Sequence, residues 1–183
     1  MYTIIVAGAL VALGAFIAGL VLWQRRRRYG ARLRRLLVLH SDARIRDVVI
    51  PDGIDGHIQI DNVLRTAAGF VIVDVVRVSG AVFGSSTIDE WTVMAGGRSH
   101  KFRNPVAPND ARVLAVRQLV PGVPVHGLVV LLGKVSFPKG TPARTVTLET
   151  LPATLSALPH MPPVTSVNVD EAWYGLSASA GAV

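Results

Sequence analysis

The sequence predicts an α/β domain built around a mixed β-sheet, preceded by one N-terminal transmembrane helix. Two observations lead to this class. Predicted elements follow in the order helix, several strands, helix and strand, which is typical of a sheet covered by helices. Residues 2–23 are apolar throughout. A chain of 183 residues with 50% hydrophobic residues is long enough for one core of ordinary size. We therefore expect one domain after the N-terminal segment.

The apolar segment 2–23 would form a helix that, at about 1.5 Å per residue, matches a hydrocarbon core of about 30 Å. A cleaved signal peptide is the alternative, but that class of segment carries positive charge before the apolar run, and none is present here. Arginines follow the run instead, so the positive-inside rule places the N-terminus outside and the domain in the cytoplasm. We expect a bacterial-type inner-membrane protein with a span at 1–24 and a basic juxtamembrane segment at 25–40 that contacts lipid headgroups.

The net charge of +7 raises the question of nucleic-acid binding. Seven of the 19 basic residues lie between positions 25 and 35, and the other 12 are matched by 12 acidic residues. A neutral domain has no general electrostatic footprint for phosphates, although Arg98, Lys101 and Arg103 form either a local phosphate-binding patch or a solvated loop. The chain has no cysteine, and its five histidines are widely spaced, which argues against disulfides and zinc sites.

The predicted elements cover the rest of the chain. After a short helical extension at 33–40, we expect strands at 44–50, 58–65, 69–78, 81–83 and 90–94. The loop 104–110 caps a helix at 111–120, the apolar run 125–132 is typical of a strand covered on both faces, and 146–148 adds an edge strand. A proline-rich link precedes a short helix at 170–176 and a small-residue end. Trp91 is expected in the core, and Trp173 is expected to attach the last helix to the domain.

Two acids interrupt the apolar strands at 58–65 and 69–78. They are Asp61 and Asp74. A buried ionised carboxylate costs several kcal/mol unless it is paired or binds a metal, so two such acids on neighbouring strands predict a site. The alternatives are structural: Asp74 pairs with Arg65 or Arg103, and Asp61 begins a turn with Asn62.

Five sequence blocks occur in a fixed order: IQID at 58–61, GFVIVDVVRVSG at 69–80, EWTV at 90–93, RNPV at 103–106 and HGLVVLLGKVSF at 126–137. Together they resemble the nuclease-related domain (NERD) family, a branch of the PD-(D/E)xK nuclease-like fold, over residues 48–151. The block VDEAWYGL resembles the closing helix of that family. The resemblance implies a restriction-endonuclease-like mixed sheet flanked by helices at 41–151, with a proline-rich link and C-terminal helix or tail at 152–183.

The resemblance also implies a site. In that family the acids of the QID and ExK blocks hold a divalent metal such as Mg²⁺, and the lysine orients the attacking water. Asp61 and Asp74 occupy the two acidic positions, as candidate catalytic residues and metal ligands, and Gln59 and Asn104 belong to neighbouring family blocks. Three departures weaken the match. Val76 stands at the lysine position with Arg77 on the opposite strand face, Pro108 replaces a usual glutamine, and residues 25–40 contain no acid for the first helix.

These departures favour a catalytically impaired NERD-like domain that acts as a binding or assembly module on the cytoplasmic side of the membrane. An intermediate hypothesis is a residual Mg²⁺ site that cannot activate water. The alternatives are an active metal-dependent nuclease tethered to the membrane and a purely structural subunit of a membrane complex. The expected partners are lipid headgroups, nucleic acid and a membrane protein.

Overall fold

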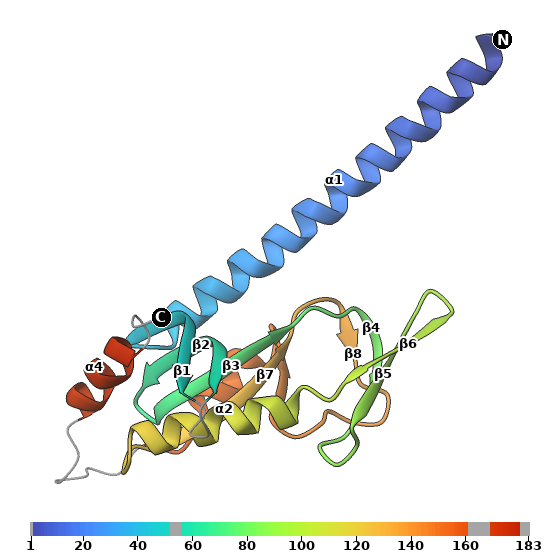
Figure 1. Ribbon diagram of the computed structural model, residues 1–183. Coiled ribbons are helices and arrows are strands. Elements are labelled where there is room, and N and C mark those ends of the chain that lie inside the picture. Colours follow the sequence, from blue (N-terminus) through green and yellow to red (C-terminus); the bar gives the residue numbers. More distant parts are fainter. Residues whose placement is uncertain (1, 52–55, 161–168, 180–183) are drawn as a thin grey trace. The chain divides into compact units, whose positions relative to one another are not determined.

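The computed structural model describes residues 2–51, 56–160 and 169–179 (Figure 1). The chain divides into two compact units, Met1–Arg35 and Leu36–Val183. Helix α1 (Tyr2–Leu39) is continuous, so the two helical segments predicted at 2–23 and 33–40 belong to one helix. Pro162 and Pro163 of the predicted proline-rich link lie outside the described residues.

In the first unit, the guanidinium carbon of Arg27 lies 3.8 Å from the centre of the Trp23 ring, which forms a cation–π contact where the apolar run ends. The side chains of residues 2–12, and of several residues between 15 and 26, are not among those described. Where side chains are described, no helix is long and apolar enough to cross a membrane. The predicted transmembrane helix therefore has no support from that part of the chain.

The second unit contains a five-stranded mixed sheet with the strand order β1-β2-β3-β7-β9 (Figure 1). The first three strands are antiparallel neighbours, and β7 and β9 run parallel to β3 and β7, respectively. The strands are β1 (Ala43–Pro51), β2 (His57–Thr66), β3 (Gly69–Val76), β7 (Val125–Leu131) and β9 (Thr145–Thr147). The predicted mixed sheet and its edge strand near 146–148 are confirmed.

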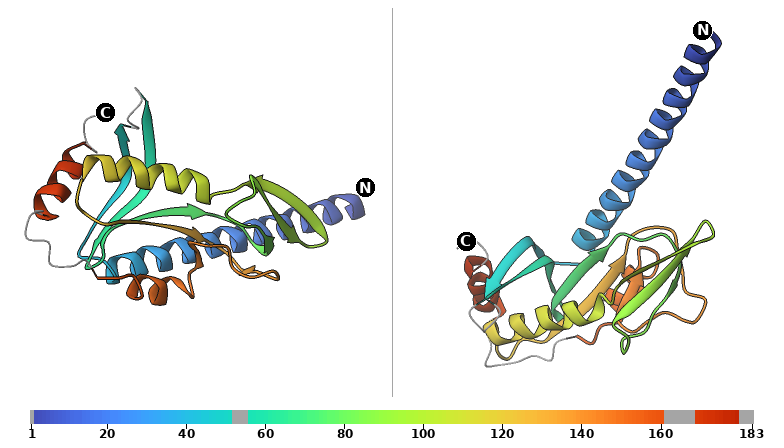
Figure 2. Two further views of the ribbon diagram at one scale, coloured as in Figure 1. Left: turned by 90° about the horizontal axis from the view of Figure 1, so that it is seen from below. Right: turned by 45° about the vertical axis from the view of Figure 1, so that its right-hand side comes forward.

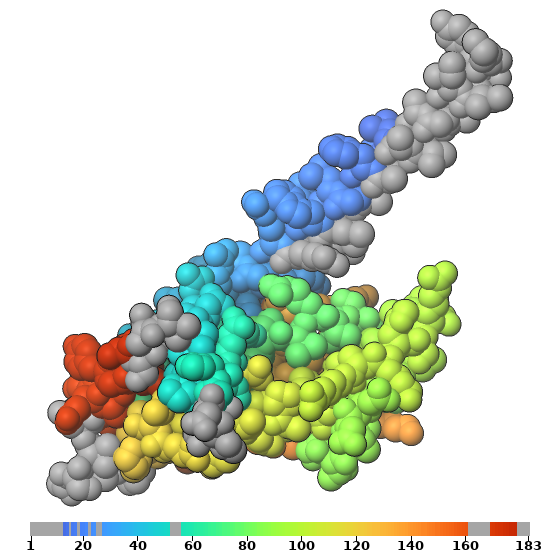
Figure 3. Space-filling model, viewed as in Figure 1, coloured from blue at the N-terminus to red at the C-terminus, as the bar shows by residue number. Residues whose placement is uncertain are grey.

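A second, four-stranded sheet has the order β6-β5-β4-β8, where the sequence predicted strands without a separate sheet. Its strands are β4 (Gly80–Phe83), β5 (Glu90–Ala95), β6 (Arg98–Arg103) and β8 (Val135–Ser136). Strand β6 escaped prediction because it is an almost wholly exposed, polar edge strand. The β5–β6 hairpin extends away from the rest of the domain (Figure 3). As predicted, Trp91 is fully buried, and its ring packs edge-on against Phe102.

Helix α2 (Val106–Leu119) lies along the five-stranded sheet (Figure 2). Helix α4 (Val169–Ser179) lies near the C-terminal end of α2. Helix α2 begins at Val106, inside the stretch predicted as a loop. The side-chain oxygen of Asn104 accepts a hydrogen bond from the Val106 N–H, and Pro108 occupies the first turn, where a helix needs no donor from it. Helix α3 (Leu151–Ser156) begins at the last residue of the predicted domain and continues into the segment predicted as a link.

The main core lies between the sheet and helices α2 and α4. It combines Phe70 and Ile72 of β3 with Val113 and Val116 of α2, together with Trp173 of α4. The rings of Trp173 and Phe70 are 5.4 Å apart in an edge-to-face arrangement at 62°. This contact confirms that Trp173 attaches the last helix to the domain.

Helix α2 lies very close to β7 at Gly127. A Cβ atom there would overlap the side chains of Asn109 and Val113. We expect Gly127→Ala to lower the free energy of unfolding by about 1–3 kcal/mol, because overpacking must displace the helix. Urea unfolding of the full chain measures the change. In Gly175→Ala, the matched control, the added Cβ meets no atom within 4 Å. Equal effects of the two substitutions would show that the close approach is not a constraint.

Candidate functional site

Asp61 lies where the pairing of β2 with β3 has ended. The β2–β3 register ends at the pair Val63 and Ile72, and side chains continue the contact beyond it. The Asn62 amide nitrogen donates to the Val73 carbonyl at 3.0 Å, and Asp61 Oδ2 accepts from the Val75 N–H at 2.9 Å. The two side chains thus replace backbone hydrogen bonds between diverging strands. The alternative that Asp61 begins a turn is wrong, because both residues lie within β2.

The pairing of Asp61 with the strand on its other side is also interrupted. The β1–β2 register contains the pairs Arg46 with Asn62 and Val48 with Ile60, but it omits Asp47 opposite Asp61. Asp47 has φ 51°, a left-handed conformation that residues other than glycine seldom adopt. A local irregularity in β1 therefore accompanies Asp61, so neither neighbouring strand pairs regularly with this position.

Asp74 is the buried acid of the site, with 6% of its surface exposed. Its Oδ2 accepts hydrogen bonds from Asn109 Nδ2 at 3.0 Å and from Arg112 Nη1 at 2.9 Å. Arg112 Nε also donates to the Gln59 carbonyl at 2.6 Å. One arginine of α2 therefore contacts β2 and β3 together. The alternative that Asp74 pairs with Arg65 or Arg103 is wrong in its partner: Asp74 pairs with Arg112, and Arg65 pairs with Asp170.

Two polar atoms of this cluster remain without a partner. In the part of the chain that the structure describes, Oδ1 of Asp74 and Oδ1 of Asn109 are buried and accept no hydrogen bond. An unsatisfied buried acceptor costs about 1–3 kcal/mol. The cluster is therefore not fully satisfied by the described residues, as is common at sites that bind a proton, an ion or a ligand.

Burial raises the pKa of the Asp74 carboxyl above its usual range. The Asn109 hydrogen bond and the Arg112 guanidinium act in the opposite direction, and the nearby negative charge of Asp61 adds to the increase. The two sequence-predicted acids are thus electrostatic neighbours. Desolvation exceeds the stabilising contacts, so the site favours a proton on Asp74 more than a free aspartate does.

The other predicted positions have different environments. The Gln59 side chain is exposed, and the backbone carbonyl of Gln59 accepts a hydrogen bond from Arg112 Nε. Asn104 is buried, and its amide donates to the carbonyls of Ser85, Ser86 and Ile88. The Asn104 side chain therefore organises the loop before β5 and the start of α2. At the lysine position, Val76 packs against the apolar cluster around Trp91.

Sequence reasoning missed Asn109 and Arg112. Both were placed around a predicted loop-to-helix boundary, whereas both lie on α2. Residues 109, 112, 113 and 116 follow helical i, i+3, i+4 and i+7 spacing, and Val113 and Val116 belong to the core. Had the helix been extended to Val106, this spacing would have directed Asn109 and Arg112 toward the sheet.

These residues fit a divalent metal poorly. Mg²⁺ prefers several oxygen ligands in near-octahedral geometry. Here Arg112 and Asn109 both bond one oxygen of Asp74, and a backbone N–H bonds one oxygen of Asp61. Within residues 2–51, 56–160 and 169–179, no group of three or more His, Cys, Asp or Glu side chains is placed to hold a metal ion. A guanidinium on Asp74 supplies the positive charge that a cation would otherwise supply.

The raised pKa of Asp74 makes folding stability depend on pH. Its usual value is 3.8, and the folded protein binds this proton more tightly than the unfolded chain does. The contribution of Asp74 to the free energy of unfolding is therefore most favourable below the usual pKa and falls as pH rises through the folded-state pKa. We expect the stability of the wild type relative to Asp74→Asn to decrease with rising pH in urea unfolding. An increase over that window would refute the assignment.

After burial and the Asn109 hydrogen bond, the charge of Arg112 also helps to set the pH range in which this contribution falls. In Arg112→Gln, the pKa of Asp74 should rise further, because a neighbouring positive charge is removed, and the pH at which stability falls should move upward. Carboxyl carbon NMR during a pH titration measures the pKa directly. Arg117→Gln is the matched control on the same helix, because Arg117 donates to the Val125 carbonyl. An equal shift in both variants would argue against a specific pair.

Comparison with known proteins supplies the family. The sequence model of the nuclease-related domain (NERD) matches residues 23–132, more than half of the chain. No curated protein and no solved structure matches. The matched region contains Asp61, Asp74, Asn109 and Arg112, so the cluster described above lies inside the family domain. The chain belongs to the nuclease-related domain family.

Proposed function

We propose that this NERD domain binds a partner and does not cleave nucleic acid. The observation that carries the proposal is the ion pair between Arg112 and Asp74, in which Arg112 Nη1 lies 2.9 Å from Asp74 Oδ2. Asp74 stands at one of the two acidic positions of the family pattern, and Arg112 neutralises it from a different element. A site built in this way favours a stable structure over exchangeable metal ligation.

Among the residues of this cluster, none is suited to activate a water molecule for attack on a phosphate. The lysine position is Val76, which has no donor and packs with apolar residues. Arg112 is a poor substitute as a proton acceptor, because a guanidinium stays protonated at any physiological pH. Both nitrogen atoms of Arg112 named above are already committed, one to Asp74 and one to the Gln59 carbonyl. These contacts support a positioning role for Arg112.

One observation favours the second candidate, a residual divalent-cation site with or without nuclease activity. Oδ1 of Asp74 is buried and has no partner among the described residues. A cation such as Mg²⁺ would satisfy it and would lower the pKa of Asp74. This candidate requires Arg112 to share or release the carboxylate.

Cleavage and metal assays on the full chain distinguish these functions. We expect no Mg²⁺- or Mn²⁺-dependent cleavage of single- or double-stranded DNA or RNA, and no heat of Mn²⁺ binding that depends on Asp74. Asp89→Asn, which changes an exposed acid, is the matched control for Asp74→Ala. Cleavage by the wild type that is lost in Asp74→Ala but kept in Asp89→Asn would refute the proposal. Mn²⁺ binding with the same dependence, but without cleavage, would support the residual cation site.

We also propose that residues 2–24 hold the chain in the inner membrane, with the domain on the cytoplasmic side. The support is the apolar sequence of 2–23 and the seven arginines that follow it. In a bacterial host, the full chain should stay in the membrane pellet after alkaline carbonate extraction, and a variant lacking 2–24 should not. Protease added outside spheroplasts should leave the domain intact. Release of the full chain by carbonate would contradict the anchor.

A further inference from the structure

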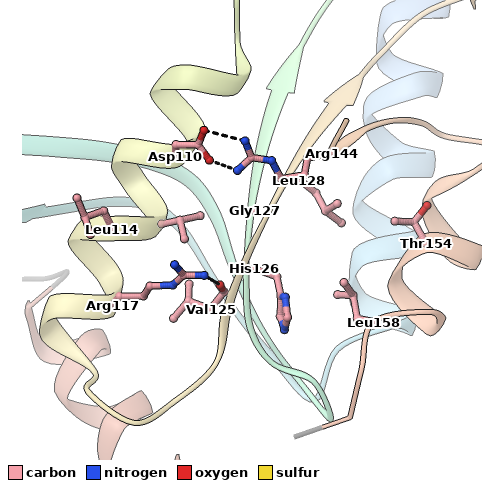
Figure 4. A pocket seen from close by; sticks show the side chains of 11 residues that line it. Asp110, Leu114, Arg117, Val125, His126, Gly127, Leu128, Arg144, Thr154 and Leu158 are labelled. Carbon is pink, nitrogen blue, oxygen red and sulfur yellow. Dashed lines mark hydrogen bonds and ion pairs between the residues drawn. The ribbon is translucent and has the colours of Figure 1, made fainter. Parts of the chain in front are cut away.

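A slot lies beside the first half of strand β7, where β9 does not reach. It has a volume of about 480 Å³ and is lined by α2, the first half of β7, α3 and the residues just after α3 (Figure 4). Arg117 lies on one wall, and Thr154 and Leu158 lie on the other. The floor is formed by the backbone and side chains of residues 125–128. The slot therefore runs along strand β7.

The floor of the slot is an unpaired strand edge. Strand β3 pairs with β7 along all of Val125–Leu131, but β9 pairs only with Val129, Val130 and Leu131 on the other side. Within the described chain, the sheet order gives residues 125–128 no neighbouring strand on that side. At about 3.3 Å per residue, this edge is long enough for about four residues of an added strand.

The backbone direction at Gly127 follows from its neighbours. The Val129 N–H donates to the Arg144 carbonyl at 2.8 Å, toward β9, and the Pro124 carbonyl accepts from Phe70, toward β3. Because successive residues of a strand direct their backbone groups to opposite sides, Val125 and Gly127 face the same side as Val129. The Val125 carbonyl accepts from Arg117 Nη2 at 2.8 Å. The N–H and C=O of Gly127 have no strand partner in the described structure.

Gly127 is buried, so leaving its backbone N–H and C=O without partners costs free energy. Asn109 and Val113 of α2 cover the side on which a Cβ would lie, and the alternation of the strand directs the backbone N–H and C=O of Gly127 toward the slot. Buried backbone groups are almost always paired, and each unpaired one costs about 1–3 kcal/mol. A peptide backbone in the slot would satisfy both groups at once.

The side chains around the slot indicate the chemistry of the occupant. Arg117 is exposed and forms no ion pair with the described residues, among which the Val125 carbonyl is its hydrogen-bond partner. Asp110 and Arg144 pair with each other across the rim, so their charges cancel. The remaining charge of the slot is positive. Val113, Leu128 and Leu158 supply apolar surface.

We propose that residues 125–128 of β7 are a docking edge for an extended peptide with an acidic group, which adds as a strand beside Gly127 and pairs with Arg117. Backbone hydrogen bonds supply the general affinity of such strand addition, and side-chain contacts supply its selectivity. The acid is either a side chain or a C-terminal carboxylate, because both offer the same planar pair of oxygens to a guanidinium. This partner class deepens the proposed binding function, but it does not depend on the state of Asp74.

Peptide binding to the full chain in non-ionic detergent tests the acid. The probes are fluorescent acetyl-VTVEVT-amide, the same peptide with glutamine for glutamate, and the glutamine peptide with a free C-terminal carboxylate. We expect saturable binding of at least one acidic probe, weakened about fivefold by loss of the acid, as for one exposed ion pair. Arg117→Gln should remove this preference, and Arg98→Gln, at an exposed arginine of the hairpin, should retain it. The better acidic probe identifies the source of the carboxylate.

Strand addition has a separate signature. Two isomers of the acidic peptide, N-methylated on odd or on even residues, differ in which edge can donate hydrogen bonds. One isomer should bind and the other should not, and the binding peptide should slow hydrogen exchange in residues 125–128. Equal behaviour of the two isomers, no saturable binding of any probe, or displacement by a short oligothymidylate would overturn the proposal. Cleavage assays are independent of these outcomes, so failure here leaves the proposed function intact.

Discussion

The contact between Asp74 and helix α2 is the interaction on which the arrangement of the domain depends. A carboxylate on a strand that is buried on both sides is tolerated only with partners, and Asn109 and Arg112 supply them from one turn of α2. Removing either partner would take away one of the two contacts that offset the burial of the carboxylate, whereas removing the acid would leave Arg112 with the backbone carbonyl of Gln59. The cluster thus fixes the rotation and position of α2 over β2 and β3, and the apolar contacts of Val113 follow from that placement.

The same cluster gives both acids of the family pattern a structural role. Asp61 and Asn62 bond the backbone of β3 where the strands diverge, so Asp61 has a structural use that needs no metal. Asp74 has a structural use through Arg112. Either acid therefore stabilises the fold independently of any catalytic role. Presence of the two acids alone is weak support for catalysis, and the partners of each acid decide the matter.

The sequence was sufficient for the strands of the main sheet, the two acids and the core tryptophans, because hydrophobic period and β-branched composition report burial directly. It failed at β6, where an exposed edge strand carries no such signal, and at the start of α2, where prolines concealed a helical first turn. The second error had the larger consequence. It hid the helical spacing of Asn109 and Arg112, and so it left the partner of Asp74 among Arg65 and Arg103. Cross-element ion pairs depend on helix rotation, which local pattern does not determine.

Gly127 connects the Asp74 cluster to the open edge of β7. Asn109 reaches Asp74 only because α2 lies close to β7, and that approach requires a residue without a side chain at position 127. The same approach brings Arg117, two helical turns after Asn109 and Asp110, to the Val125 carbonyl at the floor of the slot. A shift of α2 that weakened the Asp74 contacts would therefore also move one wall of the slot.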